Sequence, residues 1–277
     1  MALHGKSFTY NGRSSEDFDL IIGGFQSVDT PLNLARDITK STMNRYRHRT
    51  NTYGINYNDV LTFNIQLIKD PCKYSDQKDM RFTREQIREI AAWLTSPITP
   101  RIFHMFDFPE MVDQEYDYYG IFTNMSAQDN EIYCLNCLFE CNTPYALSAE
   151  QNIIIDDGEG IVSNPSDEFE DYVYPVIIIT PTADVDAPYD IRLINESDGN
   201  RSITLKNMKP QDTVTMDCQK MTVKNQSGSL MSLDDLNIDV VDYIYWFRLL
   251  HGDNQIKVSG DAIVEFIFRY PVKVGAY

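Results

Sequence analysis

Three closely spaced cysteines are the first candidates for chemistry in this sequence. Cys134, Cys137 and Cys141 fall within residues 131–142, which we predict to form a strand. On a strand, Cys134 points to the face opposite Cys137 and Cys141, and these two stand about 13 Å apart. Zinc holds its sulfur ligands about 2.3 Å from one centre, and a disulfide needs Cα atoms within about 7 Å. The spacing therefore favours cysteines that fill a core.

Histidines and clustered carboxylates are the next candidates. The chain contains four histidines: His4, His48, His104 and His251. His104 shares a predicted strand face with Ile102 and Phe106, a pattern that favours a packed side chain over a metal ligand. His251 precedes a Gly-Asp-Asn turn, for which we expect a structural role. The acidic run at 156–159 lacks the alternating ligand positions of a calcium-binding EF-hand loop, so we expect a solvated segment there.

Recognisable catalytic motifs do not occur in the sequence. It contains no Gly-x-Ser-x-Gly, phosphate-binding loop, dinucleotide fingerprint or His-Glu-x-x-His. Pairs of carboxylates arise from composition alone in a chain whose net charge is −17. We therefore expect no enzymatic activity, no cofactor and no metal ion. The enzymatic alternative is an acid hydrolase on a β-scaffold.

The acidic charge is spread unevenly along the 277 residues. Residues 1–145 carry 14 Lys and Arg against 19 Asp and Glu, a net of −5, whereas residues 146–277 carry 10 against 22, a net of −12. This balance argues against nucleic acid as a partner. The first residues lack an apolar signal-like stretch and the aliphatic runs are too short to span a bilayer, so we expect neither secretion nor membrane insertion. Five cysteines, an odd count, favour a reducing compartment during folding.

One helix organises the predicted fold, over residues 82–96. Four apolar residues recur at helical spacing and form a single stripe: Ile87, Ile90, Ala91 and Leu94. Such a stripe packs one face of a helix on a sheet. We therefore expect a single helix that covers a β-domain.

Both ends of this helix carry sequence signals. Thr83 and Gln86 have the spacing of a capping box, and Phe82 is placed to pack against the first turn as a hydrophobic staple. Pro97 is expected to move Ser96 out of the helical region and to stop the helix.

Most of the remaining chain is predicted to form strands. Residues 60–68 alternate apolar and polar side chains, as a half-buried antiparallel strand does, and Asn11-Gly12 marks a tight hairpin turn. Seven further strands with turn signals between them are predicted at 173–180, 189–195, 201–206, 213–223, 243–247, 255–258 and 262–270. Their spacing predicts an antiparallel β-sandwich.

The sequence predicts two domains, because 277 residues suffice for two cores. The N-terminal domain takes residues 1–147, with the helix and an extended arm, and the C-terminal sandwich takes residues 173–277. Residues 148–172 are acidic and contain Gly and Pro, so we predict a connector there. The fold class is mostly β (α+β).

A basic stripe interrupts the acidic chain in the segment Asn-Arg-Tyr-Arg-His-Arg. If this run is extended, Arg45, Arg47 and Arg49 lie on one face, and Tyr46 and His48 lie on the other. The stripe is either a solvated strand or loop, or an arm that contacts an acidic neighbouring copy. We take Arg45, Arg47, Arg49 and Tyr46 as candidates for an oligomer interface.

Several segments, taken in order, resemble one known family. The run Phe-x-Tyr-Asn-Gly-x-Ser-Ser-x-Asp-Phe-x-Leu-Ile, which begins at Phe8, precedes a polar arm, one helix and a second β-domain. This order resembles the distal tail proteins of bacteriophages with long, non-contractile tails. The galectin-like C-terminal domain of that family has elements similar to MDCQKMTV (216–223), Trp246-Phe247 before HGDNQIKVSG (251–260), and VEFIFRYP (264–271). The resemblance covers most of the chain, and residues 26–58 match it least.

The resemblance implies a structural protein of the virion. It implies an N-terminal domain that forms a hexameric ring between the tail tube and the tail-tip protein, closed with the help of a β-hairpin in the arm region. The galectin-like sandwich would face outward and support receptor-binding components. The protein would be made in the cytoplasm of the bacterial host and reside at the tail tip.

The alternative from a different class is a carbohydrate-binding β-sandwich module, because galectin-like sandwiches can bind sugars. Trp246 or the tyrosines would then supply an aromatic platform. Trp246 lies between Tyr245 and Phe247 in a predicted strand, and this position favours a role in the core.

Overall fold

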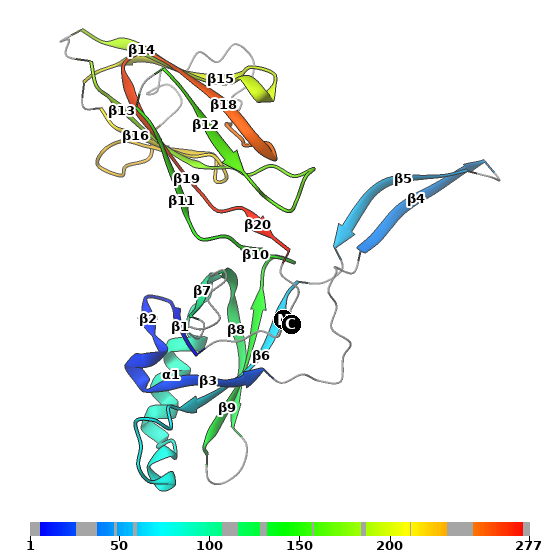
Figure 1. The fold of residues 1–277 in the computed structure, drawn as a ribbon, viewed down its shortest axis with the longest axis vertical. Helices are drawn as coiled ribbons and strands as arrows, with labels where there is room; N and C mark the ends of the chain where they lie inside the picture. The colour runs from blue at the N-terminus through cyan, green and yellow to red at the C-terminus, as the bar shows by residue number, and fades with distance from the viewer. Residues whose placement is uncertain are drawn as a thin grey trace. The chain divides into compact units, whose positions relative to one another are not determined.

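The computed structural model describes residues 6–25, 38–46, 49–57, 60–106, 116–127, 132–156, 158–183, 187–210, 212–231 and 246–273. The chain divides into two compact units (Figure 1). The N-terminal unit is Met1–Leu147 with Lys273–Tyr277, and the C-terminal unit is Ser148–Val272. Each unit has its own cluster of buried apolar side chains. Among the described residues, no helix has the length and apolar character needed to cross a bilayer.

One antiparallel sheet forms the body of the N-terminal unit. Its strands follow the order β2-β1-β7-β8-β9-β6-β3, and β10 pairs with β8. The strands are β1 (Ser7–Tyr10), β2 (Arg13–Ser14), β3 (Leu20–Phe25), β6 (Thr62–Lys69), β7 (Arg101–Phe106), β8 (Asp117–Ala127), β9 (Cys134–Cys141) and β10 (Ala146–Leu147). The strand predicted over 60–68 is confirmed as β6, which buries Phe63, Ile65 and Leu67.

The predicted Asn11-Gly12 turn joins β1 to β2. Asn11 and Gly12 have φ angles of 47° and 75°, and a two-residue hairpin turn of type I′ requires positive φ at both positions. Gly12 adopts this backbone without steric cost because it has no Cβ. Tyr10 pairs with Arg13 across the turn.

The α-helix of the described residues, α1 (Arg84–Thr95), packs against β8. Its predicted capping box is confirmed, because Thr83 Oγ1 accepts from the Gln86 amide at 3.2 Å and Gln86 Oε1 accepts from the Thr83 amide at 3.0 Å. Trp93, which the predicted stripe omitted, is also buried. Its Nε1 donates to the carbonyl of Tyr10 at 2.8 Å, which ties the helix to β1.

The end of α1 differs from the prediction in one respect. Ser96 keeps helical dihedral angles, with φ −77° and ψ −27°, although Pro97 follows it. The steric clash with proline disfavours this region without excluding it. Two short 3-10 helices complete the unit, η1 (Ser15–Phe18) and η2 (Gln77–Met80).

β4 (Ile38–Tyr46) and β5 (Arg49–Tyr57) form a separate two-stranded antiparallel sheet (Figure 1). Ile38 pairs with Tyr57 at one end of this hairpin, and Tyr46 pairs with Arg49 at the other. A strand of nine residues spans about 30 Å. The structure therefore has a long hairpin in the arm region.

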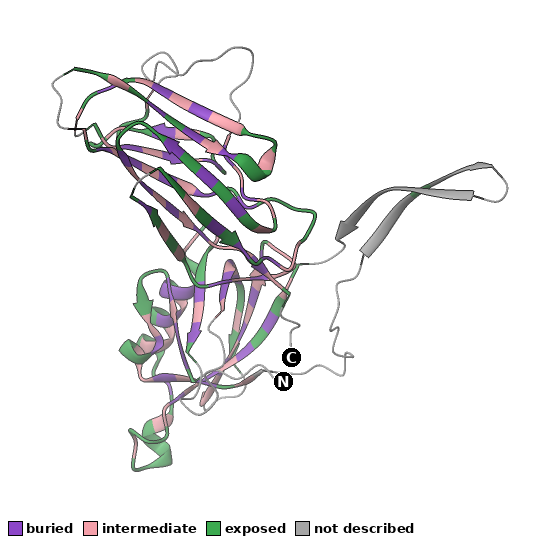
Figure 2. Ribbon diagram, turned by 45° about the horizontal axis from the view of Figure 1, so that its top comes forward, coloured by how far each residue is buried: buried purple, intermediate pink, exposed green. Residues whose placement is uncertain are grey.

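Two antiparallel sheets share one core in the C-terminal unit. Five strands follow the order β11-β19-β13-β16-β17, and four follow the order β12-β18-β14-β15. The elements are β11 (Gln151–Ile155), β12 (Glu159–Asn164), β13 (Val176–Pro181), β14 (Tyr189–Asn195), η3 (Glu196–Asp198), β15 (Arg201–Met208), β16 (Val214–Asp217), β17 (Thr222–Lys224), β18 (Gly252–Ser259), β19 (Ala262–Phe268) and β20 (Pro271–Val272). Buried residues alternate with exposed ones along these strands (Figure 2). This is the antiparallel sandwich that the strand spacing predicts.

The connector expected over residues 148–172 is wrong. Within it, β11 pairs with β19 and β12 pairs with β18, so this segment supplies one edge strand to each sheet of the sandwich. β11 is itself apolar, with the sequence QNIII, but acidic residues and two glycines follow it at 156–160. These flanking residues make the segment resemble a linker.

Two predicted strands also differ. Residues 213–223 form two strands, β16 and β17, separated by a turn at residues 218–221. The strand predicted over 243–247 lies partly outside the described residues. Its last residues, Trp246 and Phe247, belong to no strand, and Leu249 forms an isolated bridge with Val173.

Candidate interaction surfaces

The cysteines of β9 serve as packing groups. Cys137 and Cys141 are buried in the N-terminal core, and Cys134 is half-buried on the other face of the strand. Burial raises the pKa of the Cys137 and Cys141 thiols to about 12. Within the described ranges, no group of three or more His, Cys, Asp or Glu side chains could hold a metal ion.

His104 lies on the outer face of the N-terminal sheet. Its Nδ1 is 2.5 Å from Asp117 Oδ1, and the two residues pair across β7 and β8. Ile102 and Phe106, on the same face of β7, are each 37% exposed. The expected packing of His104 is therefore partial, because this face of β7 is turned toward solvent and the opposite face supplies the core.

The described candidate residues of the arm, Arg45, Tyr46 and Arg49, lie on two different strands. β4 ends at Tyr46 and β5 begins at Arg49, and these two residues pair across the end of the hairpin. The expected one-face arrangement applies to a single extended strand through all three arginines, whereas Arg45 belongs to β4 and Arg49 belongs to β5. Arg45 and Arg49 lie near the same end of the hairpin, and Arg47 lies outside the described residues. Residues 38–57 still contain four Lys and Arg and no Asp or Glu.

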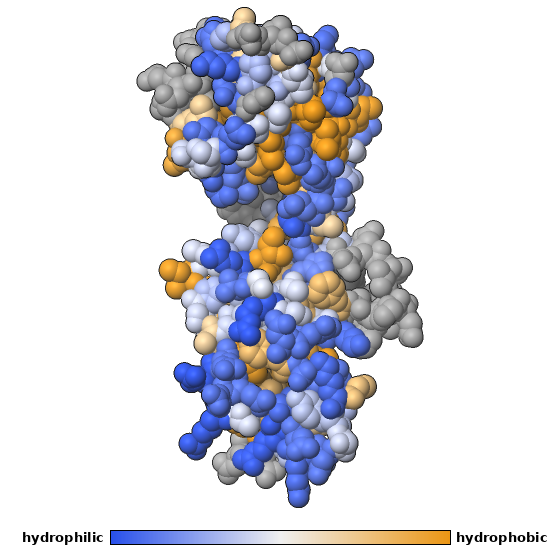
Figure 3. Space-filling model, turned by 90° about the vertical axis from the view of Figure 1, so that its left-hand side faces the viewer, coloured by the Kyte–Doolittle hydropathy of each residue, from blue (hydrophilic) through white to orange (hydrophobic). Residues whose placement is uncertain are grey.

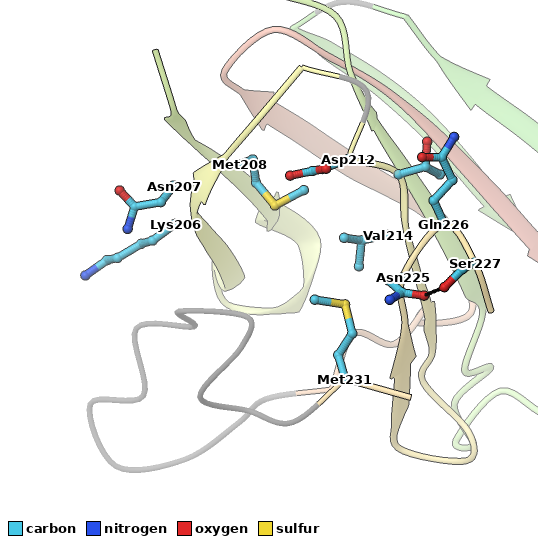
Figure 4. A pocket seen from close by; sticks show the side chains of 10 residues that line it. Lys206, Asn207, Met208, Asp212, Val214, Asn225, Gln226, Ser227 and Met231 are labelled. Atoms are coloured by element: carbon cyan, nitrogen blue, oxygen red, sulfur yellow. Dashed lines mark hydrogen bonds between the residues drawn. The ribbon is translucent and has the colours of Figure 1, made fainter. Parts of the chain in front are cut away.

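A cavity of about 500 Å³ opens in the C-terminal unit (Figure 4). The side chains of Met208 and Met231 line it together with Lys206, Asp212 and Asn225. Among the described residues that line it, none is aromatic. The described lining of the cavity therefore offers no aromatic platform of the kind that the carbohydrate-binding alternative requires.

The outer face of the five-stranded sheet is rich in aliphatic side chains. Ile154 on the edge strand β11 is 61% exposed. It pairs with Glu265, which pairs in turn with Ile178, so one face continues across the sheet. Half-buried aliphatic residues share this face: Val176, Ile178, Ile263 and Ile267. Hydrophobic surface also gathers on this unit in the space-filling view (Figure 3), which makes this face a candidate contact surface.

Buried side-chain amides tie strands together in the C-terminal sandwich. Asn164, Asn195 and Asn254 are fully buried. Asn254 Oδ1 accepts from the Leu250 amide at 2.9 Å and from Asn195 Nδ2 at 3.0 Å. Asn164 Nδ2 donates to the carbonyl of Leu250 at 3.1 Å. The segment before β18 is therefore held in place by the strands on either side.

Arg248 extends from this fixed segment toward the surface. Its Nε and Nη2 donate to the two carboxylate oxygens of Asp198 at 2.8 and 2.9 Å, a bidentate pair. Its guanidinium carbon lies 3.7 Å from the centroid of the Tyr172 ring, within the range of a cation–π interaction. The hydrogen bonds from Arg248 lower the pKa of Asp198. Both groups therefore stay ionised near neutral pH.

Three aromatic side chains within residues 169–174 are exposed, and one of them, Tyr172, contacts Arg248. Phe169, Tyr172 and Tyr174 are 70%, 37% and 38% exposed. Val173, between the two tyrosines, is buried and pairs with Leu249, so the alternation of an extended chain turns both tyrosines outward. Two exposed carboxylates accompany the rings. We call this surface the aromatic–acidic patch; its members are Phe169, Glu170, Asp171, Tyr172 and Tyr174.

This patch is not predicted from the sequence, because residues 148–172 resemble a solvated connector. A signal was present, since three aromatic residues fall within the six residues 169–174 and a solvated linker rarely holds so many. The contact between the rings of Phe169 and His251, with centroids 4.4 Å apart, joins positions far apart in the chain. No local pattern reveals such a contact.

Two family models match the chain. The model of a phage tail protein N-terminal domain matches residues 3–143, and the model of a phage tail C-terminal domain matches residues 145–268. Together they account for nearly the whole sequence. Among curated proteins, no sequence matches this chain.

Solved structures of phage tail components share the fold. One is the Dit protein of phage SPP1, described as a paradigm of the hub adsorption apparatus in phages that infect Gram-positive bacteria. It is 12% identical with a TM-score of 0.64, over 95% of this chain and 98% of that chain. A chain of the phage P2 baseplate, in its activated conformation with calcium, is 7% identical with a TM-score of 0.58, over 98% and 99%. The same baseplate with strontium gives equal values.

Proposed function

This chain belongs to the family of phage tail proteins whose N-terminal and C-terminal domain models it matches, and we propose that it is a structural hub of a phage tail tip or baseplate. Six copies would form a ring through their N-terminal units. The ring would join the tail tube to the tail-tip protein and support the host-adsorption components. The observation that carries this proposal is the likeness of fold to the SPP1 Dit protein over 95% of the chain.

The distribution of charge along the chain supports a ring in which two different surfaces of neighbouring copies meet. A closed ring repeats one heterologous contact, so each copy needs two different complementary patches. The hairpin β4–β5 carries four basic and no acidic residues, whereas the rest of the chain has 20 Lys and Arg against 41 Asp and Glu. Opposite charge favours encounter and sets register. We assign Arg45, Arg47, Arg49 and Tyr46 to the contact between neighbouring copies.

In this proposal, the C-terminal unit faces outward and binds other tail components. It presents two surfaces to solvent, the aliphatic face of the five-stranded sheet and the aromatic–acidic patch. Aromatic residues are enriched where proteins bind one another. The hub would therefore act as a virion component that binds other tail proteins, without enzymatic activity, a cofactor, nucleic acid or membrane insertion.

Charge reversal in the hairpin of the full-length protein tests this proposal. Arg45, Arg47 and Arg49 are replaced together by Glu, and light scattering gives the mass over a range of protein concentrations. A matched control replaces three exposed basic residues of η2 and α1 by Glu: Lys78, Arg84 and Arg88. This control changes the net charge by the same amount as the hairpin variant does, but on a different surface.

We expect the unaltered protein and the control to reach the mass of six copies. The hairpin variant should remain smaller while its circular dichroism and melting temperature stay unchanged. A hairpin variant that assembles as fully as the control would refute the assignment of the arginines.

Trp246, the first platform candidate of the carbohydrate-binding alternative, is partly buried and packs against the C-terminal core. The other candidates were the tyrosines, of which Tyr172 and Tyr174 are exposed, but the described residues that line the cavity of this unit include no aromatic side chain. We therefore propose no lectin activity for this site.

A further inference from the structure

We propose that the outer edge of β11 (Gln151–Ile155) binds an extended segment of a different protein, which adds as a further strand to the five-stranded sheet. The segment would carry aliphatic residues at alternate positions and a lysine or arginine at each end. This inference rests on the outward role proposed above for the C-terminal unit, and it names the docking surface and the chemistry of the partner segment.

β11 is an edge strand whose outer side is open. It pairs with β19 on one side, and among the described strands none follows it on the other side. In an antiparallel pair, alternate residues direct their N–H and C=O groups away from the partner strand. Among the described residues, no backbone hydrogen bond outside the sheet reaches β11. Its outer edge therefore offers backbone groups with which an added strand can pair.

The other described edges of the sandwich carry features that discourage such pairing. Natural edge strands are commonly protected by charged side chains or by a covering segment. β17 is covered by residues 230–231, which form a bridge and a hydrogen bond to it. β12 begins with Glu159, and β15 contains Arg201 and Lys206. β11 has the sequence QNIII, without charge, proline or glycine, so its own side chains do not block an added strand.

The sheet face beside this edge offers apolar contacts to the added strand. Ile154 points outward from β11 and is 61% exposed. Its row continues through Glu265 to Ile178, and half-buried Ile267 and Val176 lie opposite each other in the next row. Side chains of adjacent strands contact each other on one face of a sheet. Aliphatic residues of the added strand would therefore pack on Ile154 and extend an existing apolar face.

The charges around β11 favour a basic partner. β11, β19 and the residues that directly flank them carry four carboxylates: Glu150, Asp156, Asp261 and Glu265. The same residues include one guanidinium, that of Arg269, whose Nη2 lies 3.5 Å from Glu150 Oε2. Four negative groups against one positive group leave a charge of −3. The whole C-terminal unit has nine Lys and Arg against 22 Asp and Glu, so its field attracts the same kind of partner.

The two carboxylates at the ends of β11 define where the basic residues belong. Glu150 and Asp156 are exposed, and their even spacing from Ile154 places them on the same face of an extended chain. Two β11 strands paired antiparallel would bring Glu150 of one copy opposite Asp156 of the other, and like charges opposite each other destabilise a strand pair. A second copy is therefore disfavoured, and a segment with basic ends is favoured.

A designed peptide with the proposed chemistry tests the edge of the full-length protein. The basic peptide is KTVTVTK with blocked ends and a fluorescent label, and its valines and lysines share one face in either strand direction. The acidic control replaces both lysines by glutamate. We expect fluorescence anisotropy to show at least about tenfold tighter binding of the basic peptide, and added salt to weaken that binding. Equal affinities would reject the basic partner.

N-methylated peptides test whether the contact is strand pairing. One version carries N-methyl groups on its valines and the other carries them on its threonines. Because alternate amides of a strand face the same neighbour, one version should lose at least about tenfold in affinity and the other should lose much less. Two versions that bind equally well would reject pairing through the backbone.

A matched pair of protein variants tests the place of binding. Ile154→Lys puts a charged side chain on the proposed edge and should weaken binding of the basic peptide at least about tenfold. Ile161→Lys is the control, since Ile161 is 52% exposed on β12 of the other sheet, and it should bind as the unaltered protein does. Equal affinities of the two variants would overturn the docking site.

Hydrogen exchange tests whether the edge is open in the protein alone. We expect alternate amides of β11 to exchange quickly without peptide and to slow when the basic peptide is bound. Slow exchange of every β11 amide without peptide would mean that the chain covers its own edge, and this result would overturn the inference.

The mass of the same samples separates this inference from the proposed hub. A protein that stays monomeric with tail tube protein added, but binds the basic peptide at β11, would support the docking edge and contradict the hub. A ring of six copies that does not bind the peptide would overturn the docking edge and leave the hub intact.

Discussion

The side-chain amide of Asn195 donates to the side-chain oxygen of Asn254 at 3.0 Å, and both residues are fully buried. Asn254 Nδ2 also donates to the carbonyl of Val162 at 3.2 Å. Replacing Asn254 by Ala leaves buried groups without partners, at a cost of about 1 to 3 kcal/mol for each. We expect the free energy of opening in β12 and β18, measured by native-state hydrogen exchange, to fall by about 2 kcal/mol or more.

Gln255→Ala is the control for this change. Gln255 is exposed on the same strand, and a substitution there should alter stability by less than about 0.5 kcal/mol. Equal exchange rates in the two variants would show that the amide network contributes nothing to the sandwich.

Asp198 should make the C-terminal unit sensitive to acid. The hydrogen bonds from Arg248 lower its pKa below the ordinary value of 3.8. A carboxyl with a lowered pKa contributes stability above its ordinary pKa and loses it as the pH falls through the folded value. We expect Asp198→Asn to be less stable than the unaltered protein at pH 7, and this difference to narrow below about pH 3.8 in urea denaturation.

Asp253→Asn removes an exposed carboxylate from the same unit and serves as the control. Its effect on the free energy of unfolding should be small both at pH 7 and below about pH 3.8. The two proteins are compared by their free energies of unfolding. If the difference between Asp198→Asn and the unaltered protein does not change with pH, Asp198 has no ionic role.

Lys69 should anchor the loop before α1. It is 3% exposed, and its Nζ donates to the carbonyls of Asp79 and Arg81, each at 3.0 Å. Lys69→Met keeps the volume of the side chain and removes both hydrogen bonds, worth about 1 kcal/mol each. Hydrogen exchange of residues 70–82 should accelerate accordingly.

Lys73 provides the contrast. Its ion pair with Asp19 is 2.6 Å long, with side chains 46% and 45% exposed, and such exposed pairs contribute little to stability. We expect residues 70–82 to exchange more slowly in Lys73→Met than in Lys69→Met. The opposite order would mean that burial of the lysine does not determine how strongly it stabilises this loop.

The five cysteines should react in a definite order with a thiol reagent at pH 8. Cys72 is exposed and should react first, and half-buried Cys134 should follow. The three buried cysteines should react only after unfolding, because burial raises their pKa to about 12: Cys137, Cys141 and Cys218. Mass analysis of the labelled peptides gives the order, and rapid labelling of Cys137 in native protein would contradict the packing.

The features that the sequence predicts correctly depend on residues that lie close together in the chain. The capping box of α1 joins Thr83 to Gln86, and the burial of β6 follows a period of two. In both cases, the residues that determine the structure are close neighbours in the chain. The strand order and the pairing partners are not set by such neighbours.

Contacts between distant residues explain what the sequence left open. β11 pairs with β19, more than a hundred residues away, so acidic flanks and glycines made an edge strand resemble a linker. Arg248 meets Tyr172 only because Val173 and Leu249 bridge two segments of the sandwich. The basic run is divided between two strands, and the sequence pattern does not reveal that Arg45 lies on β4 and Arg49 on β5.

Electron imaging of the largest species that the purified protein forms at low salt tests the hub most directly. We predict a closed ring of six copies that loosens as salt rises, because screening weakens the contact between the basic hairpin and an acidic neighbour. A protein that remains monomeric at every concentration and salt, with tail tube protein added as well, would contradict the hub.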